Sequence, residues 1–134
     1  MIQDLHGNGN PAFSRMFTGD TTAPVVTASS INALTVLEPD APGTFTPLTV
    51  TYTFSEAIDQ TTLTTDDVQF RTGIAGNEFD SDVINAASVT YNAALNQLTA
   101  VFNRGRDNLN TLTLVSGATG IHDLAGNPLN GSPN

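Results

Sequence analysis

Five oxygen-bearing side chains stand in three short segments that are far apart in the sequence. They are Asp20, then Glu56 with Asp59, and finally Asp123 with Asn127. Calcium takes six to eight hard oxygen ligands from carboxylates, amide side chains, backbone carbonyls and water. A fold that brings the three segments together would therefore supply a calcium-binding set. If the fold keeps them apart, Asp20 and Asp123 would instead act as Asx turns that close their own loops.

The same residue types also permit catalytic interpretations, which the sequence does not favour. His122 adjoins Asp123 and lies near Ser116, but a nucleophilic triad also needs a strained nucleophile turn such as G-x-S-x-G, which the sequence lacks. Glu56 and Asp59 could form a glycosidase pair, yet a spacing of three residues beside a strand end is explained more simply by loop chemistry. We therefore predict that the chain is not an enzyme.

A short motif occurs twice and suggests a tandem array. Residues 2–8 read IQDLHGN and residues 121–127 read IHDLAGN, so five of seven positions agree at a separation of 119 residues (121 minus 2). In the first copy Asp4 and Asn8 are the counterparts of Asp123 and Asn127, and they would form an equivalent site only if a neighbouring repeat surrounds them. We therefore expect residues 1–19 to be the last loop and strand of a preceding repeat, and residues 20–134 to be the next repeat without its own last strand.

Composition and periodicity indicate one all-β domain. The chain has 134 residues, a formal net charge of −9 and no cysteine, which argues against a nucleic-acid partner and excludes disulfides and thiolate zinc sites. No apolar stretch is long enough to insert into a membrane. Residues 47–55 alternate strictly between apolar residues and threonine or serine, as a half-buried strand does. We expect further strands at residues 24–28, 68–70, 87–91, 97–102 and 111–115, and a single helical turn at residues 59–63.

Three motifs in order resemble the bacterial immunoglobulin-like repeats of large secreted and cell-surface proteins of the adhesin type. They are GDTTAP at residues 19–24, FSEAID at 54–59 and GIHDLAGNPL at 120–129. The resemblance implies an immunoglobulin-like antiparallel β-sandwich of about seven strands with Greek-key connections, used as an extracellular structural or adhesive module. It also implies calcium, because the DTTAP opening and the D-x-x-G-N loop often accompany that ion in related repeats.

In an immunoglobulin-type topology the three segments that carry Asp20, Glu56 and Asp123 lie at one pole. Carboxylates that converge there would repel one another unless a cation or solvent relieves them. A sandwich without its last strand leaves an open edge, which a strand from another copy can fill. We expect residues 12–18 to be that strand, with Phe13 and Phe17 as its anchors, so that copies join head to tail into a filament. The alternative is an accessory carbohydrate-binding module of a secreted enzyme.

Overall fold

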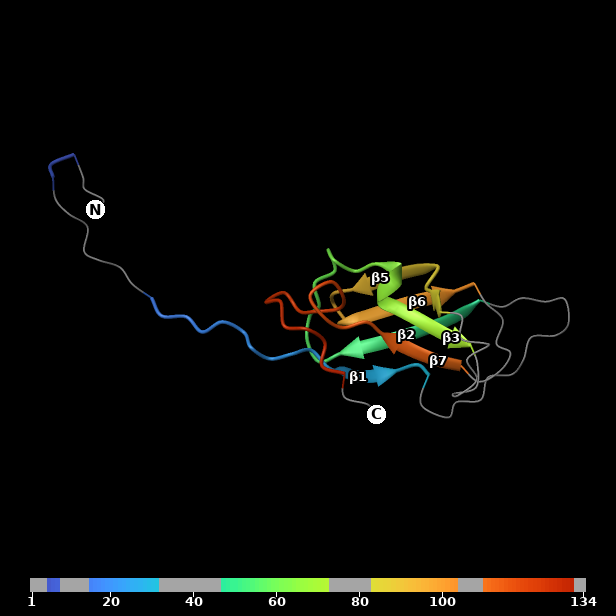
Figure 1. Cartoon of the computed structure of the whole chain (residues 1–134). Helices are drawn as coiled ribbons and strands as arrows, with labels where there is room; N and C mark the ends of the chain where they lie inside the picture. Colours follow the sequence, from blue (N-terminus) through green and yellow to red (C-terminus); the bar gives the residue numbers. More distant parts are fainter. Residues whose placement is uncertain (1–4, 8–14, 32–46, 73–82, 104–109, 132–134) are drawn as a thin grey trace, which may run out of the picture.

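The computed structural model describes residues 5–7, 15–31, 47–72, 83–103 and 110–131. The strands among them form two antiparallel sheets (Figure 1). The four-stranded sheet has the order β1-β2-β6-β5 and the three-stranded sheet has the order β4-β3-β7. Their bounds are β1 Val26–Ser29, β2 Leu48–Phe54, β3 Val68–Thr72, β4 Val83–Asn85, β5 Ser88–Asn92, β6 Gln97–Phe102 and β7 Asn110–Leu114, with one 3-10 turn, η1, at Thr65–Asp67. The prediction of an all-β chain with two antiparallel sheets is confirmed.

Strand β2 shows why these residues form a sheet. Its apolar side chains are 0 to 7% exposed, whereas the threonines between them are exposed or half-buried. Successive side chains of a strand point to opposite faces, so strict alternation gives one apolar and one polar face. Strand β6 pairs antiparallel with β2 and buries Leu98, Ala100 and Phe102 on the same side. These two central strands supply one wall of the core.

The opposite wall comes from the three-stranded sheet. Phe70 on β3 and Phe102 on β6 are both almost completely buried, and their ring centroids lie 5.6 Å apart with a tilted geometry. Contact between residues of the two sheets defines a β-sandwich core. Burial at this core also raises the pKa of Tyr52 from 10.0 to about 12, because the phenolate would lose its hydration.

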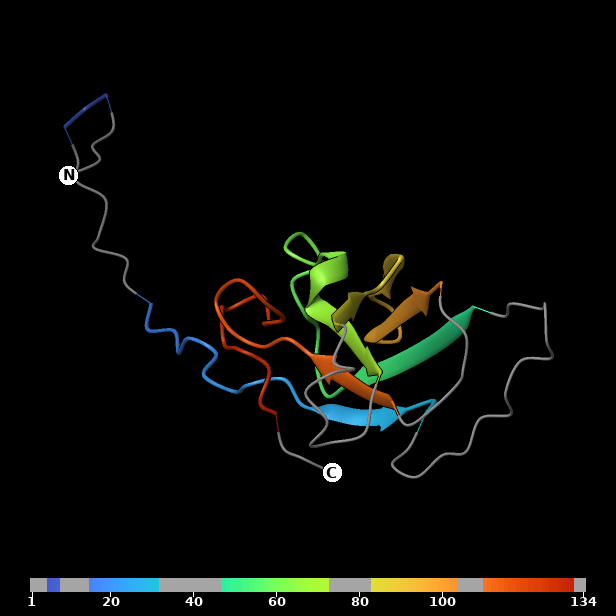
Figure 2. The same ribbon diagram turned by 45° about the vertical axis from the view of Figure 1, so that its right-hand side comes forward.

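The chain beyond β7 folds back over one end of the sandwich. Ile121 N donates to Val115 O (2.8 Å), and Leu129 N donates to Ile121 O (2.9 Å). Asn130 N then donates to Pro24 O (2.9 Å), which ties this last segment to the residues that lead into β1. We call this end, built from residues 20–25, 55–59 and 115–130, the entry pole. The residues before it, 15–19, run away from the sheets (Figures 1 and 2).

Two predictions about local structure differ from the structure. The helical turn expected at residues 59–63 is instead η1, a few residues later, because Asp67 Oδ2 accepts hydrogen bonds from both the backbone N and the hydroxyl of Thr64. Asp59 instead uses its carboxylate to accept from Thr61 N, which makes an Asx turn. Strand β4 was not expected, and it forms through antiparallel pairing of Phe70 with Ile84.

Candidate metal centre at the entry pole

Three carboxylates from distant parts of the sequence converge at the entry pole. Asp20, Glu56 and Asp123 each offer one oxygen, and these oxygens all lie within 4.8 Å of one another. Asp20 precedes β1, Glu56 follows β2, and Asp123 lies in the loop after β7. The sequence prediction that these three segments share one pole therefore agrees with the geometry. We call these three residues the carboxylate cluster.

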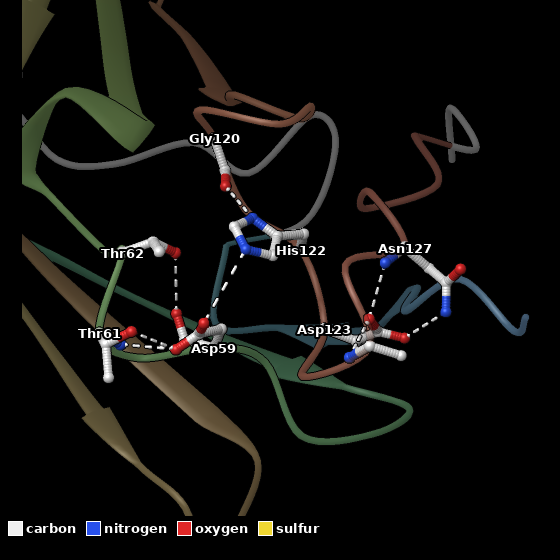
Figure 3. A network of polar contacts seen from close by, with 8 residues as sticks. Asp59, Thr61, Thr62, Gly120, His122, Asp123 and Asn127 are labelled. Atoms are coloured by element: carbon white, nitrogen blue, oxygen red, sulfur yellow. Dashed lines mark hydrogen bonds and ion pairs between the residues drawn. The ribbon is translucent and has the colours of Figure 1, made fainter. Parts of the chain in front are cut away.

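The loop around Asp123 is shaped by its own side chain (Figure 3). Asp123 Oδ1 accepts hydrogen bonds from Ala125 N (2.8 Å) and Asn127 N (2.7 Å), while Oδ2 accepts from Asn127 Nδ2 (2.7 Å). Gly126 has φ of +90°, which favours glycine at this turn. Burial alone would raise the pKa of Asp123, but the hydrogen bonds from Asn127, Ala125 and Gly126 outweigh it and lower the pKa. Asp123 is therefore held as a carboxylate although it is only 2% exposed.

Asn127 joins this loop to residues 20–25, which lead into β1 and which we call the entry segment. Its Nδ2 also donates to the backbone oxygen of Asp20 (3.2 Å), across 107 positions of sequence. Asp20 Oδ1 in turn accepts from Thr22 N (2.9 Å), which forms an Asx turn just before β1. Because the amide nitrogen of Asn127 is engaged by Asp123 and Asp20, its side-chain oxygen is the atom that it could offer to a cation.

Glu56 is the member of the cluster whose charge is least compensated. Its Oε1 atom is buried and has no hydrogen-bond partner in the described structure. Burial raises the pKa of Glu56, and the negative charges of Asp20 and Asp123 raise it further. A buried carboxylate oxygen without a donor is unfavourable, and a bound cation would supply the missing partner. The three residues therefore have the ligand atoms that could hold a hard cation.

The structure gives Asp59 a different set of contacts (Figure 3). Its Oδ1 accepts from the hydroxyl (2.7 Å) and the backbone N (2.9 Å) of Thr61, and its Oδ2 lies 4.0 Å from His122 Nε2. The two hydrogen bonds from Thr61 lower the pKa of Asp59, and His122 lowers it slightly more against the opposing effect of burial. Asp59 is thus next to the cluster but is not one of the three converging carboxylates.

His122 and Ser116 do not have the contacts of a nucleophilic triad. His122 Nδ1 lies 2.8 Å from Gly120 O, and its other ring nitrogen faces Asp59. The hydroxyl of Ser116 donates to Leu129 O. In a triad the imidazole would bridge the serine hydroxyl and the aspartate.

Of the remaining predicted residues, Phe17 is 93% exposed, whereas Asp4, Asn8 and Phe13 lie outside the described residues. The sequence reasoning missed Ser55, which fixes the entry segment: its hydroxyl accepts from Val25 N (3.1 Å), and its N donates to Val25 O (2.9 Å). Its position directly after the strict alternation of β2 is the sequence signal that could have identified it.

Comparisons with protein-family models, with curated proteins and with solved structures found no match. Within the described ranges, no helix is long and apolar enough to cross a membrane. The class defined by the structure is an all-β protein with two antiparallel sheets packed around a common core.

Proposed function

We propose that this chain is a non-enzymatic structural module of an extracellular or cell-surface bacterial protein, and that calcium stabilises its entry pole. The observation that carries the proposal is the buried, unpartnered Oε1 of Glu56 beside the carboxylates of Asp20 and Asp123. The ligands would be these three carboxylates, with Asn127 Oδ1 or backbone carbonyls completing the shell. Calcium suits such an all-oxygen set, since it accepts flexible coordination by six to eight oxygens.

The strand order supports an immunoglobulin-like version of the sandwich. In that fold strands A, B, E and D form one sheet in this order, and C and F are neighbours in the other. The order β1-β2-β6-β5 corresponds to A-B-E-D, and β4-β3-β7 corresponds to C′-C-F. The position beside β7 would then belong to a last strand, G. Together with the resemblance of the three sequence motifs, this order favours a repeat of the adhesin type.

The proposed role of the cation is mechanical. Asp20 belongs to the segment through which the chain enters the module, whereas Glu56 and Asp123 belong to the body of the sandwich. An ion held by all three would connect the entering chain to the body and restrict the angle between the module and whatever precedes it. Extracellular calcium-binding modules have dissociation constants of about 0.1 to 1 mM, which is the range that we expect for this site.

The test compares thermal unfolding of the wild type, Glu56→Gln and Asp66→Asn with calcium, with magnesium and with a chelator. At free calcium 100 times Kd, linkage predicts about 2.7 kcal/mol of stabilisation. With an unfolding entropy of about 2.1 cal/mol/K per residue over about 110 residues, this raises Tm by about 12 °C. Asp66, an exposed aspartate whose Oδ1 accepts from Asn85 Nδ2 (2.6 Å), is the matched control outside the cluster.

We expect Asp66→Asn to keep the calcium-dependent rise and Glu56→Gln to lose it. In chelator, Glu56→Gln should melt above the wild type, because a neutral amide removes the repulsion from Asp20 and Asp123. A wild-type Tm that does not change over millimolar calcium would refute the metal proposal. An equal rise with magnesium would show general screening of charge rather than a calcium site.

A further inference from the structure

The outer edge of β7 is unpaired in the part of the chain that the structure describes. In the described residues β7 ends the three-stranded sheet and pairs only with β3. Val115 N donates toward the β3 side, to Asp67 O (2.8 Å). Because backbone groups alternate in direction along an antiparallel ladder, those of Leu112 and Leu114 point away from β3. These are the groups that an added strand would bind.

The core is also incompletely covered on that side. The side chains of Leu112 and Leu114 pack against the core but are only partly buried. Strand β1, whose Val26 is likewise partly buried, lies on the same side of the molecule (Figures 1 and 2). A strand beside β7 would cover these three side chains. It would need apolar residues on the face that it turns toward the core.

The chain itself contains a segment with this character. Met16 and Phe17 are 103% and 93% exposed, and they belong to residues 15–19, which run away from the sandwich (Figure 2). By the register of the repeated motif, residues 12–18 follow the first copy where a strand after β7 and its loop would follow the second. The segment around Phe17 therefore has the place in the repeat, and the exposed apolar side chains, that are expected of a strand that pairs with β7.

The direction in which the segment around Phe17 would run along β7 decides whether it could add to its own molecule or to another one. The C-terminal end of β7 lies at the entry pole, where Val115 O accepts a hydrogen bond from Ile121 N. Residues 16–18 are also tethered at the entry pole by their C-terminal end, through Asp20. In the same molecule they could therefore lie beside β7 only in parallel, whereas the named strands of the described residues all pair antiparallel. Residues 16–18 could therefore pair antiparallel with β7 only in a second molecule.

We propose that the segment around Phe17 of one molecule adds to the β7 edge of a second as an antiparallel strand, so that copies join head to tail. The inference rests on the proposed immunoglobulin-like architecture, in which a last strand lies beside β7, and it does not require the metal. The donor would leave the acceptor at the end opposite the entry pole, where its own module begins. Such a contact uses two different surfaces and does not close, so it favours open chains.

The experiment measures molar mass by light scattering at low and high concentration of the full chain, for the wild type, Phe17→Ser and Leu95→Ser. Leu95 is an exposed apolar residue in the turn between β5 and β6, and it controls for general surface hydrophobicity. We expect wild type and Leu95→Ser to reach at least twice the 14.0 kDa of one chain, and Phe17→Ser to stay at that mass. A monomeric wild type, or oligomers that survive Phe17→Ser, would overturn the proposal.

Mixing separates strand addition from other association. Phe17→Ser keeps its β7 edge, so it should bind a wild-type donor and stop growth, lowering the mean mass of wild-type oligomers. Amide hydrogen exchange of Leu112 and Leu114 should slow as wild-type concentration rises. Added salt should not dissociate the oligomers, because copies of a chain with net charge −9 repel one another. Glu56→Gln should still oligomerise, so failure of the metal proposal and failure of this one are distinguishable.

Discussion

Gly120 occupies a position that leaves no room for a side chain. A Cβ atom there would lie 2.5 Å from Val115 O, 2.9 Å from Val115 C and 3.0 Å from Ser116 C. All three are backbone atoms, and Val115 O also accepts the hydrogen bond from Ile121 N. Gly120→Ala therefore cannot be relieved by rotating a neighbouring side chain. The strand end or the loop must move by about 0.9 Å to restore an ordinary contact of 3.4 Å.

A forced methyl group in a packed region costs about 1 to 3 kcal/mol. With an unfolding entropy of about 0.23 kcal/mol/K for about 110 residues, the middle of this range lowers Tm by about 9 °C. The displaced loop also carries Asp123, three residues further on, so the rise in Tm that the proposed calcium site predicts should become smaller. The assay is calorimetry with calcium and with chelator.

Gly131→Ala is the matched control, because a Cβ atom at Gly131 would have no neighbour within 4 Å. It should melt within about 1 °C of the wild type, as substitutions at unconstrained surface sites generally do. If Gly120→Ala and Gly131→Ala melt at the same temperature, the close packing of Gly120 against the end of β7 is wrong.

Two further predictions concern ionisation. The pKa of Tyr52 is raised from 10.0 to about 12 in the folded state, so the stability that the neutral phenol contributes is complete below pH 10 and is lost as the pH rises through 12. This loss is about 3 kcal/mol. When Tm is followed from about pH 10 to 12, Tyr52→Phe should show a smaller fall in Tm than the wild type. The pKa of Asp59 is lowered below 3.8, so its contribution is present at neutral pH and is lost as the pH falls below 3.8. Asp59→Asn should therefore melt below the wild type at pH 7 and match it in strong acid, and an abolished calcium response in this variant would instead make Asp59 a ligand.

The strands that the sequence predicted are those with clear periodicity. Strand β6 begins and ends where it was expected, and β2 differs from its expected range by one residue at each end. Strand β4 has three residues, too few to show a period of two, and it depends on pairing with β3. Its existence is a tertiary effect that no local pattern reveals.

The carboxylate cluster could be predicted as far as topology determines it. Asp20, Glu56 and Asp123 come together because the segment before β1, the segment after β2 and the loop after β7 meet at the same pole. The different contacts of Asp59 could not be predicted, because Asx turns and metal ligands use the same side chain. Asp123 takes part in both arrangements. Its oxygens accept hydrogen bonds from its own loop, and one of them also lies close to the carboxylates of Glu56 and Asp20.

The alternation of β2 also bears on fidelity during folding. A slip of one residue against β6 would replace Leu48, Val50, Tyr52 and Phe54 in the core by threonines and Ser55, so the misaligned sheet would lose most of its apolar wall. The buried face of β2 therefore admits one register against β6, and the pairing of these two central strands is fixed by the core that they build.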